Sequence, residues 1–223
     1  MTTTKGFIFL GPPGCGKGTQ TDILSKELNL PHIDTGSLLR KNIKEGTEIG
    51  VVAKGYIDKG QLVPIEVVSA VIKNRLAEDD CKKGYILDGY PRSLEQAYAL
   101  DDIIKELKMD VELTAFYFDI PTSVLVERLV NRRSCPVCGK IYNLKTSAPK
   151  IEGKCDICKV DLIQRKDDTE ETALLRFETY NKETHPLLDF YTKRGILKKI
   201  NANQSIDKVW EELSKLANVK EKV

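Results

Sequence analysis

The residues best suited to chemistry lie near the N-terminus, in the glycine-rich stretch GPPGCGKGT at positions 11–19. Glycines let backbone N–H groups approach phosphate oxygens closely, and Lys17 adds a mobile positive charge. The stretch follows an apolar run at residues 7–10 and leads into a helical pattern, so a helix dipole would also face a bound anion. The sequence therefore predicts a phosphate-binding loop, rather than a plain turn between a strand and a helix.

One position departs from the usual phosphate-loop pattern. A Ser or Thr whose hydroxyl binds Mg²⁺ should follow Lys17, but the residue there is Gly18, and Thr19 comes one place later. Magnesium readily keeps several waters and can be held by one carboxylate together with the phosphates. We expect Asp88, at the end of another apolar run, to hold Mg²⁺ through water. The alternative is that Asp88 only forms the turn before Gly89.

Four of the six cysteines form a second chemical cluster. They follow the pattern C-x2-C-x16-C-x2-C at Cys135, Cys138, Cys155 and Cys158. This spacing is typical of zinc held by four thiolates, which leaves no open coordination position. The pattern predicts a structural zinc ion, with buried or incidental cysteines as the alternative. Of the isolated cysteines, Cys15 lies beside Lys17 at a helix N-terminus, an environment that lowers a thiol pKa and favours reaction with oxidants.

The elements that must position these groups can be read from the apolar pattern. Short apolar runs alternate with stretches of helical periodicity, which is typical of a parallel sheet with helices on both faces. Predicted strands lie at 7–10, 31–33, 85–87, 113–118 and 196–200, and predicted helices at 19–28, 65–76, 122–130 and 206–216. Residues 131–168 interrupt this alternation and contain all four clustered cysteines, so we interpret them as an insertion.

Composition excludes several other classes of protein. The 223 residues carry 35 basic and 33 acidic side chains, a net charge of +2, which argues against a chain-wide nucleic-acid or lipid footprint. No apolar stretch approaches the ~20 residues that a membrane span needs. The N-terminus also lacks the features of a signal peptide. We therefore expect a cytoplasmic protein without nucleic-acid or membrane partners.

Four stretches together resemble one family. They are GPPGCGKGTQ, DTGSLLR (34–40), GYILDGYPRSLEQA (84–97) and RKDDTEETALLR (165–176). These closely resemble adenylate kinases of the long form, whose lid carries a four-cysteine zinc site, and the match covers nearly the whole chain. The resemblance implies a P-loop nucleoside monophosphate kinase fold with a central five-stranded parallel sheet. It also implies a monomer that uses Mg²⁺ to transfer a phosphoryl group reversibly from ATP to AMP, giving two ADP.

The resemblance further implies a division into domains and a set of site residues. The core would comprise 1–34, 65–130 and 169–223, with a helical AMP-binding insertion at 35–64 and a zinc-binding lid at 131–168. ATP would contact Gly14, Cys15, Gly16, Lys17, Gly18, Thr19, Arg128, Arg132 and Gln204. AMP would contact Thr35, Arg40, Gly89, Arg92, Gln96, Arg165 and Arg176. The catalytic set would be Lys17, Arg92, Arg132, Arg165 and Arg176, and Asp167 and Asp168 match carboxylates of the lid hinge.

The residue chemistry agrees with these roles. Phosphoryl transfer depends on positioning and charge stabilisation, and planar, permanently charged arginines supply both. The acceptor is already a phosphate oxygen, so no general base is needed, and we expect His32 and His185 to be structural. Arg133 has no support from a motif, and we interpret it as a surface charge of the lid.

Two alternatives remain open at this point. A nucleoside monophosphate kinase with another acceptor base, or one that uses GTP, would carry nearly the same motifs. A zinc ribbon that binds nucleic acid and is attached to an NTPase is a different class. Its four lysines, Lys140, Lys145, Lys150 and Lys154, would favour it, but only Tyr142 among them could stack on a base.

Overall fold

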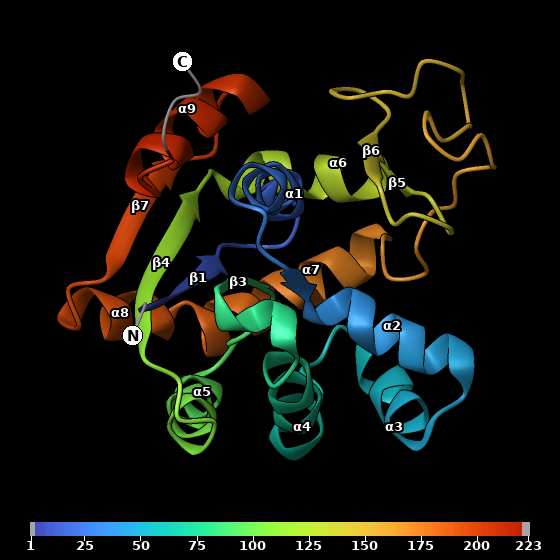
Figure 1. Ribbon diagram of the computed structural model, residues 1–223. Coiled ribbons are helices and arrows are strands. Elements are labelled where there is room, and N and C mark those ends of the chain that lie inside the picture. Colours follow the sequence, from blue (N-terminus) through green and yellow to red (C-terminus); the bar gives the residue numbers. More distant parts are fainter. Residues whose placement is uncertain (1–2, 220–223) are drawn as a thin grey trace.

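Five parallel strands form the centre of the molecule. The computed structural model describes residues 3–219 (Figure 1). The strands are β1 (Thr4–Leu10), β2 (His32–Asp34), β3 (Gly84–Asp88), β4 (Val111–Asp119) and β7 (Leu197–Asn201), in the spatial order β2-β3-β1-β4-β7. Each pairing is parallel, so all five carboxyl ends lie at one edge. The predicted strand positions and the α/β class are confirmed.

Helices cover both faces of this sheet. Successive side chains of β1 point to opposite faces and are apolar, so each face packs against helices. Phe7 and Phe9 pack with α1 (Lys17–Leu28), α6 (Leu125–Val130), α7 (Glu170–Thr179) and α9 (Ile206–Leu216). Ile8 and Leu10 pack with α4 (Ile65–Leu76), α5 (Leu94–Glu106) and α8 (Pro186–Lys193). These two apolar layers hold the sheet between the helices, so the carboxyl ends of its strands have fixed positions.

Short helical segments complete the core. Single 3₁₀ turns occur at Asp79–Lys82 and at Thr122–Val124, so the helix predicted over 122–130 begins as a 3₁₀ turn before α6. A π-helical turn, Tyr180–Thr184, joins α7 to α8. Trp210 packs against the core as expected, although it is only partly buried.

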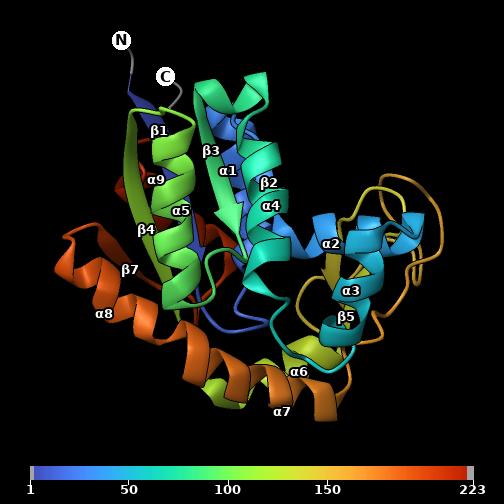
Figure 2. The same cartoon turned by 90° about the horizontal axis from the view of Figure 1, so that it is seen from below.

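Two insertions project from the same side of the core (Figures 1 and 2). The first contains α2 (Thr35–Glu45) and α3 (Glu48–Ile57), which pack so closely that a Cβ on Gly50 would lie 2.1 Å from the carbonyl oxygen of Asn42. The second contains the antiparallel pair β5 (Arg132–Ser134) and β6 (Ile141–Asn143). Each insertion has its own small apolar cluster, the first around Leu39 and the second around Tyr142.

Candidate active site

The glycine-rich loop connects β1 to α1 as predicted. Gly14 and Gly16 have φ angles of 82° and 99°, which side-chain-bearing residues adopt rarely, so glycine is needed for the path of the loop. The Nζ of Lys17 donates hydrogen bonds to the carbonyl oxygens of Gly11 (2.6 Å) and Pro12 (3.1 Å). The lysine is thus folded over the loop, within reach of an anion bound there. Cys15 is buried and packs in the core cluster, with its Sγ 3.4 Å from the Nζ of Lys17.

A cavity of about 1070 Å³ opens over this loop. Nearly every residue expected to contact a nucleotide lines it, although they come from distant parts of the chain. The lining includes Gly14, Cys15, Gly16, Lys17, Gly18, Thr19, Arg40, Gly89, Arg92, Arg128, Arg132, Arg165, Arg176 and Gln204, together with Asp88. The two exceptions are Thr35 and Gln96, which are buried beside the cavity and do not line it.

The two exceptions differ in their hydrogen bonds. Gln96 accepts a hydrogen bond from the backbone N–H of Arg92 at 2.7 Å, through its side-chain oxygen. The guanidinium of Arg92 is itself directed by the carbonyl oxygen of Gly89, which accepts from Nε at 2.8 Å. The hydroxyl of Thr35 is buried without a hydrogen-bond partner among the described residues. A small movement of this wall of the cavity would therefore expose the unpaired hydroxyl of Thr35.

Asp88 lies at the carboxyl end of β3, directly opposite Gly18. Its Oδ2 is 3.6 Å from the position that a Cβ on Gly18 would occupy, so the missing side chain leaves room beside the carboxylate. His32 stands on the other side, with Nε2 3.6 Å from Asp88 and Nδ1 2.9 Å from Asp22. Burial disfavours the charged imidazole, but the hydrogen bonds and charges of the two carboxylates outweigh it and raise the pKa of His32 to about 10. His32 is a charged neighbour of Asp88, which the sequence analysis did not anticipate.

An arginine cluster lines the same cavity as the loop. Arg132 and Arg176 are held by two adjacent carboxylates that precede α7. Asp168, fully buried, accepts from Nε of Arg132 at 2.8 Å and forms a second contact with the same guanidinium. Asp167 accepts from Arg176 at 2.9 Å. Arg165 lies near them, and no carboxylate among the described residues forms an ion pair with it.

The electrostatics of this cluster favour an anion. Burial, followed by the charge of Arg132, lowers the pKa of both Arg165 and Arg176 to about 10. Both guanidinium groups remain protonated at neutral pH, so positive charge is concentrated in a partly enclosed space. Such a site stabilises phosphate oxygens more strongly than separate arginines in water do.

A further carboxylate of the cavity lies beside Arg40. Asp34 caps α2 by accepting from the N–H of Gly36 at 2.9 Å, and it lies 3.6 Å from Arg40. Burial opposes ionisation of Asp34, but Arg40, with Ser37 and His32, lowers its pKa. Sequence reasoning missed this residue, although an Asp directly before a helical run is a recognisable N-cap signal.

Two further residues expected to contact ATP, Arg128 and Gln204, line the same cavity. The carbonyl of Arg128, in the last turn of α6, accepts from the side chain of Asn143 in the second insertion at 3.0 Å. Gln204, after β7, donates to Glu212 of α9 at 3.2 Å. Both positions are fixed by contacts that the sequence pattern does not reveal.

The four clustered cysteines fit a zinc ion. Their Sγ atoms all lie within 4.8 Å of one another, and those of Cys138 and Cys155 are 3.7 Å apart. Tetrahedral Zn–S bonds of about 2.3 Å place sulfurs about 3.8 Å apart. Burial disfavours the thiolate of Cys155, but the N–H of Cys158 and the hydroxyl of Tyr142 outweigh it and lower the pKa of Cys155 to about 6.

Comparisons with known proteins agree on one family. The sequence model of the family described as Adenylate kinase matches residues 9–196, more than half of the chain. A relative from Clostridium novyi (strain NT), named Adenylate kinase, is 50% identical over 207 residues, which cover 93% of this chain and 95% of the relative. Another relative with this name, from Caldanaerobacter subterraneus subsp. tengcongensis, is 49% identical and covers 93% and 94% of the two chains.

Proposed function

Because this chain belongs to the adenylate kinase family, we propose that the cavity over the phosphate loop is its catalytic centre. The enzyme transfers the γ-phosphoryl group of ATP to AMP reversibly and gives two ADP. One observation supports this assignment of the site. Lys17 and the loop residues line the same cavity as Arg132, Arg165 and Arg176, and a transfer between two anionic nucleotides needs positive groups of this kind around the phosphates.

On the donor side, the amides of residues 14–19 and Lys17 would hold the phosphates of ATP. Arg128 would stack on the adenine ring, and Gln204 would also contact ATP. Magnesium, when bound, neutralises phosphate charge, and Asp88 would hold its waters in the space that Gly18 leaves open. Thr19, one place late in the motif, would contribute its backbone N–H.

On the acceptor side, Arg40 and Arg92 would bind the phosphate of AMP, with Thr35, Gly89 and Gln96 around the nucleoside. The phosphate would displace Asp34 as the partner of Arg40, because a dianion competes with a carboxylate for the same guanidinium. Arg132, Arg165 and Arg176 would surround the phosphoryl group in flight and stabilise its charge without a general base.

The two insertions would close over the substrates. We assign residues 35–64 to the acceptor side and 131–168 to the donor side, and the rest to the core. Their separate apolar clusters support movement as two units. Closure would exclude water, which otherwise accepts the phosphoryl group. Zinc at the four cysteines would stabilise the second insertion, whose own core is small.

The remaining assignments concern the state of the protein. We propose a monomer located in the cytoplasm that does not bind nucleic acid. Within residues 3–219, no helix is both long enough and apolar enough to cross a membrane. Light scattering tests the monomer, and salt-dependent binding to DNA or RNA would contradict the last assignment.

A substrate panel tests the function. Each of AMP, UMP, CMP and GMP is offered as acceptor with ATP or GTP as donor, and kcat/KM is measured for each pair. We expect AMP with ATP to give the highest value by a wide margin. A higher value for another acceptor would assign the chain a different base specificity at the same site.

A further inference from the structure

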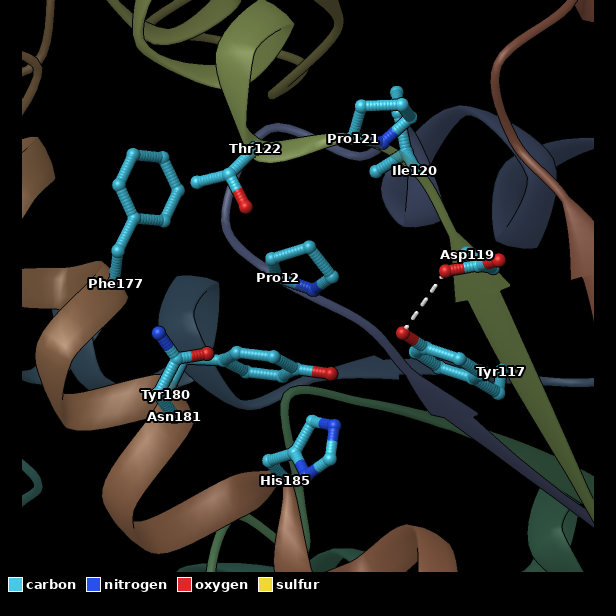
Figure 3. Close-up of a pocket in the computed structure, with 10 residues that line it drawn as sticks. All are labelled: Pro12, Tyr117, Asp119, Ile120, Pro121, Thr122, Phe177, Tyr180, Asn181 and His185. Carbon is cyan, nitrogen blue, oxygen red and sulfur yellow. Dashed lines mark hydrogen bonds between the residues drawn. The ribbon is translucent and has the colours of Figure 1, made fainter.

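A second cavity of about 350 Å³ lies behind the phosphate loop, separate from the nucleotide cavity (Figure 3). Its walls come from the loop, the end of β4, the following 3₁₀ turn and the π-helical turn. The residues that line it are Pro12, Tyr117, Asp119, Ile120, Pro121, Thr122, Phe177, Tyr180, Asn181 and His185. Only Tyr180 also lines the nucleotide cavity, so its ring forms part of the wall between the two.

The cavity contains unused hydrogen-bonding groups. The hydroxyl of Tyr180 is buried and points toward that of Tyr117 in Figure 3, but no partner among residues 3–219 lies within hydrogen-bond geometry; the residue as a whole is only 8% exposed. Burial raises the pKa of Tyr180 well above its usual value, so the hydroxyl keeps its proton and can donate. The side-chain amide of Asn181 and the imidazole of His185 also face this space in Figure 3. An unpaired buried hydroxyl is costly, so a ligand that accepts a hydrogen bond from it would remove a real penalty.

The charge of the cavity is already balanced. Asp119 accepts a hydrogen bond from the hydroxyl of Tyr117 at 3.2 Å, drawn as a dashed line in Figure 3, and pairs with Lys199 at 2.8 Å. No other acidic side chain lines the cavity. The lining therefore does not require a charged ligand, and Pro12 and Phe177 contribute apolar surface to it.

The π-helical turn creates this arrangement. The N–H of His185 donates to the carbonyl of Tyr180 at 2.8 Å, five residues back, and places the two rings edge to face with centroids 6.5 Å apart. On the same turn, Thr184 donates to the backbone carbonyl of Arg92 at 2.7 Å. Turns of this kind occur frequently at functional sites. This one joins the second cavity to a residue of the proposed acceptor site.

We propose that this cavity is a second ligand site, which binds a neutral, planar heterocycle of nucleobase size through the hydroxyl of Tyr180 and the amide of Asn181. The volume lies within the range of small-molecule sites. Such a ring would pack on Pro12, whose carbonyl also accepts from Lys17, so it would contact the phosphate loop from behind.

The probe is 5-fluorouracil, titrated into the zinc-loaded full chain and followed by fluorine NMR. It is neutral, planar and not an adenine, so it does not match the base of either substrate. We expect a saturable shift in the millimolar range that persists when Mg²⁺ and ADP fill the nucleotide cavity. Tyr180→Phe keeps the ring but removes the donor, and it should weaken binding about tenfold.

Tyr85→Phe is the matched control, because Tyr85 is also fully buried with an unpartnered hydroxyl, but it packs among α4, α5 and α8 on the other face of the sheet. It should bind the probe like the wild type. Asn181→Ala is a second variant that should weaken binding, and thermal unfolding checks that each variant is folded. The proposal is overturned if the wild type gives no saturable shift, or if Tyr180→Phe and Asn181→Ala both bind the probe as the wild type does.

Discussion

The Oδ2 atom of Asp88 lies 3.6 Å from the place where Gly18 would carry a side chain. The glycine that departs from the usual phosphate-loop pattern therefore faces a carboxylate from another strand. This relationship supports the proposal that Asp88 of β3, and not the loop, holds the waters of Mg²⁺.

Replacing that carboxylate tests the relationship. Asp88→Asn should raise the Mg²⁺ concentration needed for half-maximal rate and lower kcat by about 10- to 100-fold, because the metal waters lose a charged acceptor. Asp22→Asn is the control, since it removes the other carboxylate of His32 and leaves the space beside Gly18 unchanged. An equal Mg²⁺ requirement in Asp88→Asn and wild type would contradict the role.

Lys17 provides the second test. Lys17→Met should lower kcat by about 100-fold or more, because the loop would lose the positive charge that stabilises the phosphate oxygens during transfer. Lys26→Met, in the last turn of the same helix, should retain wild-type kinetics. Circular dichroism and metal analysis confirm that both variants fold and hold zinc, and a near wild-type rate for Lys17→Met would refute its role.

Asp168 should contribute to the stability of the fold through its buried pair with Arg132. Asp168→Asn leaves the buried guanidinium of Arg132 without its charged partner, and we expect a loss of about 3 kcal/mol in the free energy of unfolding. Asp161→Asn breaks an ion pair with Lys154 in the same insertion, but its carboxylate is 80% exposed, so the loss should stay below about 1 kcal/mol. Urea titrations of both variants measure the difference, and equal losses would count against a buried pair.

Zinc removal tests the four-cysteine site. Purified protein should contain one zinc ion per chain, and chelation should lower the melting temperature by roughly 4–8 °C if the metal contributes about 2 kcal/mol. Cys155→Ser should lose the metal. Cys81→Ser, which alters a buried cysteine of the core, should retain it. Full metal content in Cys155→Ser would exclude the proposed ligand set.

The pKa of His32 makes stability depend on pH. The folded value is about 10 and the ordinary value is 6.5. The stabilisation is therefore complete below about pH 6.5 and is lost as the pH rises toward 10. Each pKa unit corresponds to about 1.4 kcal/mol, so the loss should be a few kcal/mol.

His32→Gln isolates this effect, because other titrating groups are common to both proteins. The wild type should exceed the variant in unfolding free energy by more at pH 6 than at pH 9. A difference that is the same at both pH values would show that His32 does not change its protonation on unfolding.

Local patterns in the sequence predicted most of the fold. An apolar run that ends in Asp or Gly indicates the end of a strand, and the glycine spacing around Lys17 indicates the loop. Both features can be predicted because they depend only on residues close together in the sequence. The cysteine spacing is equally local, and the structure brings the four sulfurs together.

Contacts between residues that are distant in the sequence could not be predicted in this way. Arg132 and Asp168 are 36 residues apart, and their pairing depends on how the second insertion returns to the core. The burial of Gln96, the charge on His32 and the π-helical turn likewise arise from packing between elements. The resemblance supplied the identities of the site residues, and only the structure supplies their partners.

The arginine cluster has a consequence for how the enzyme meets its substrates. The whole chain carries a net charge of only +2, so at long range it attracts a nucleotide weakly. If nucleotides bind in this cavity as proposed, the concentrated positive charge of the buried arginines acts on them only near its mouth. Dissolved salt screens charges least at such short range, so we expect substrate capture to depend only weakly on ionic strength.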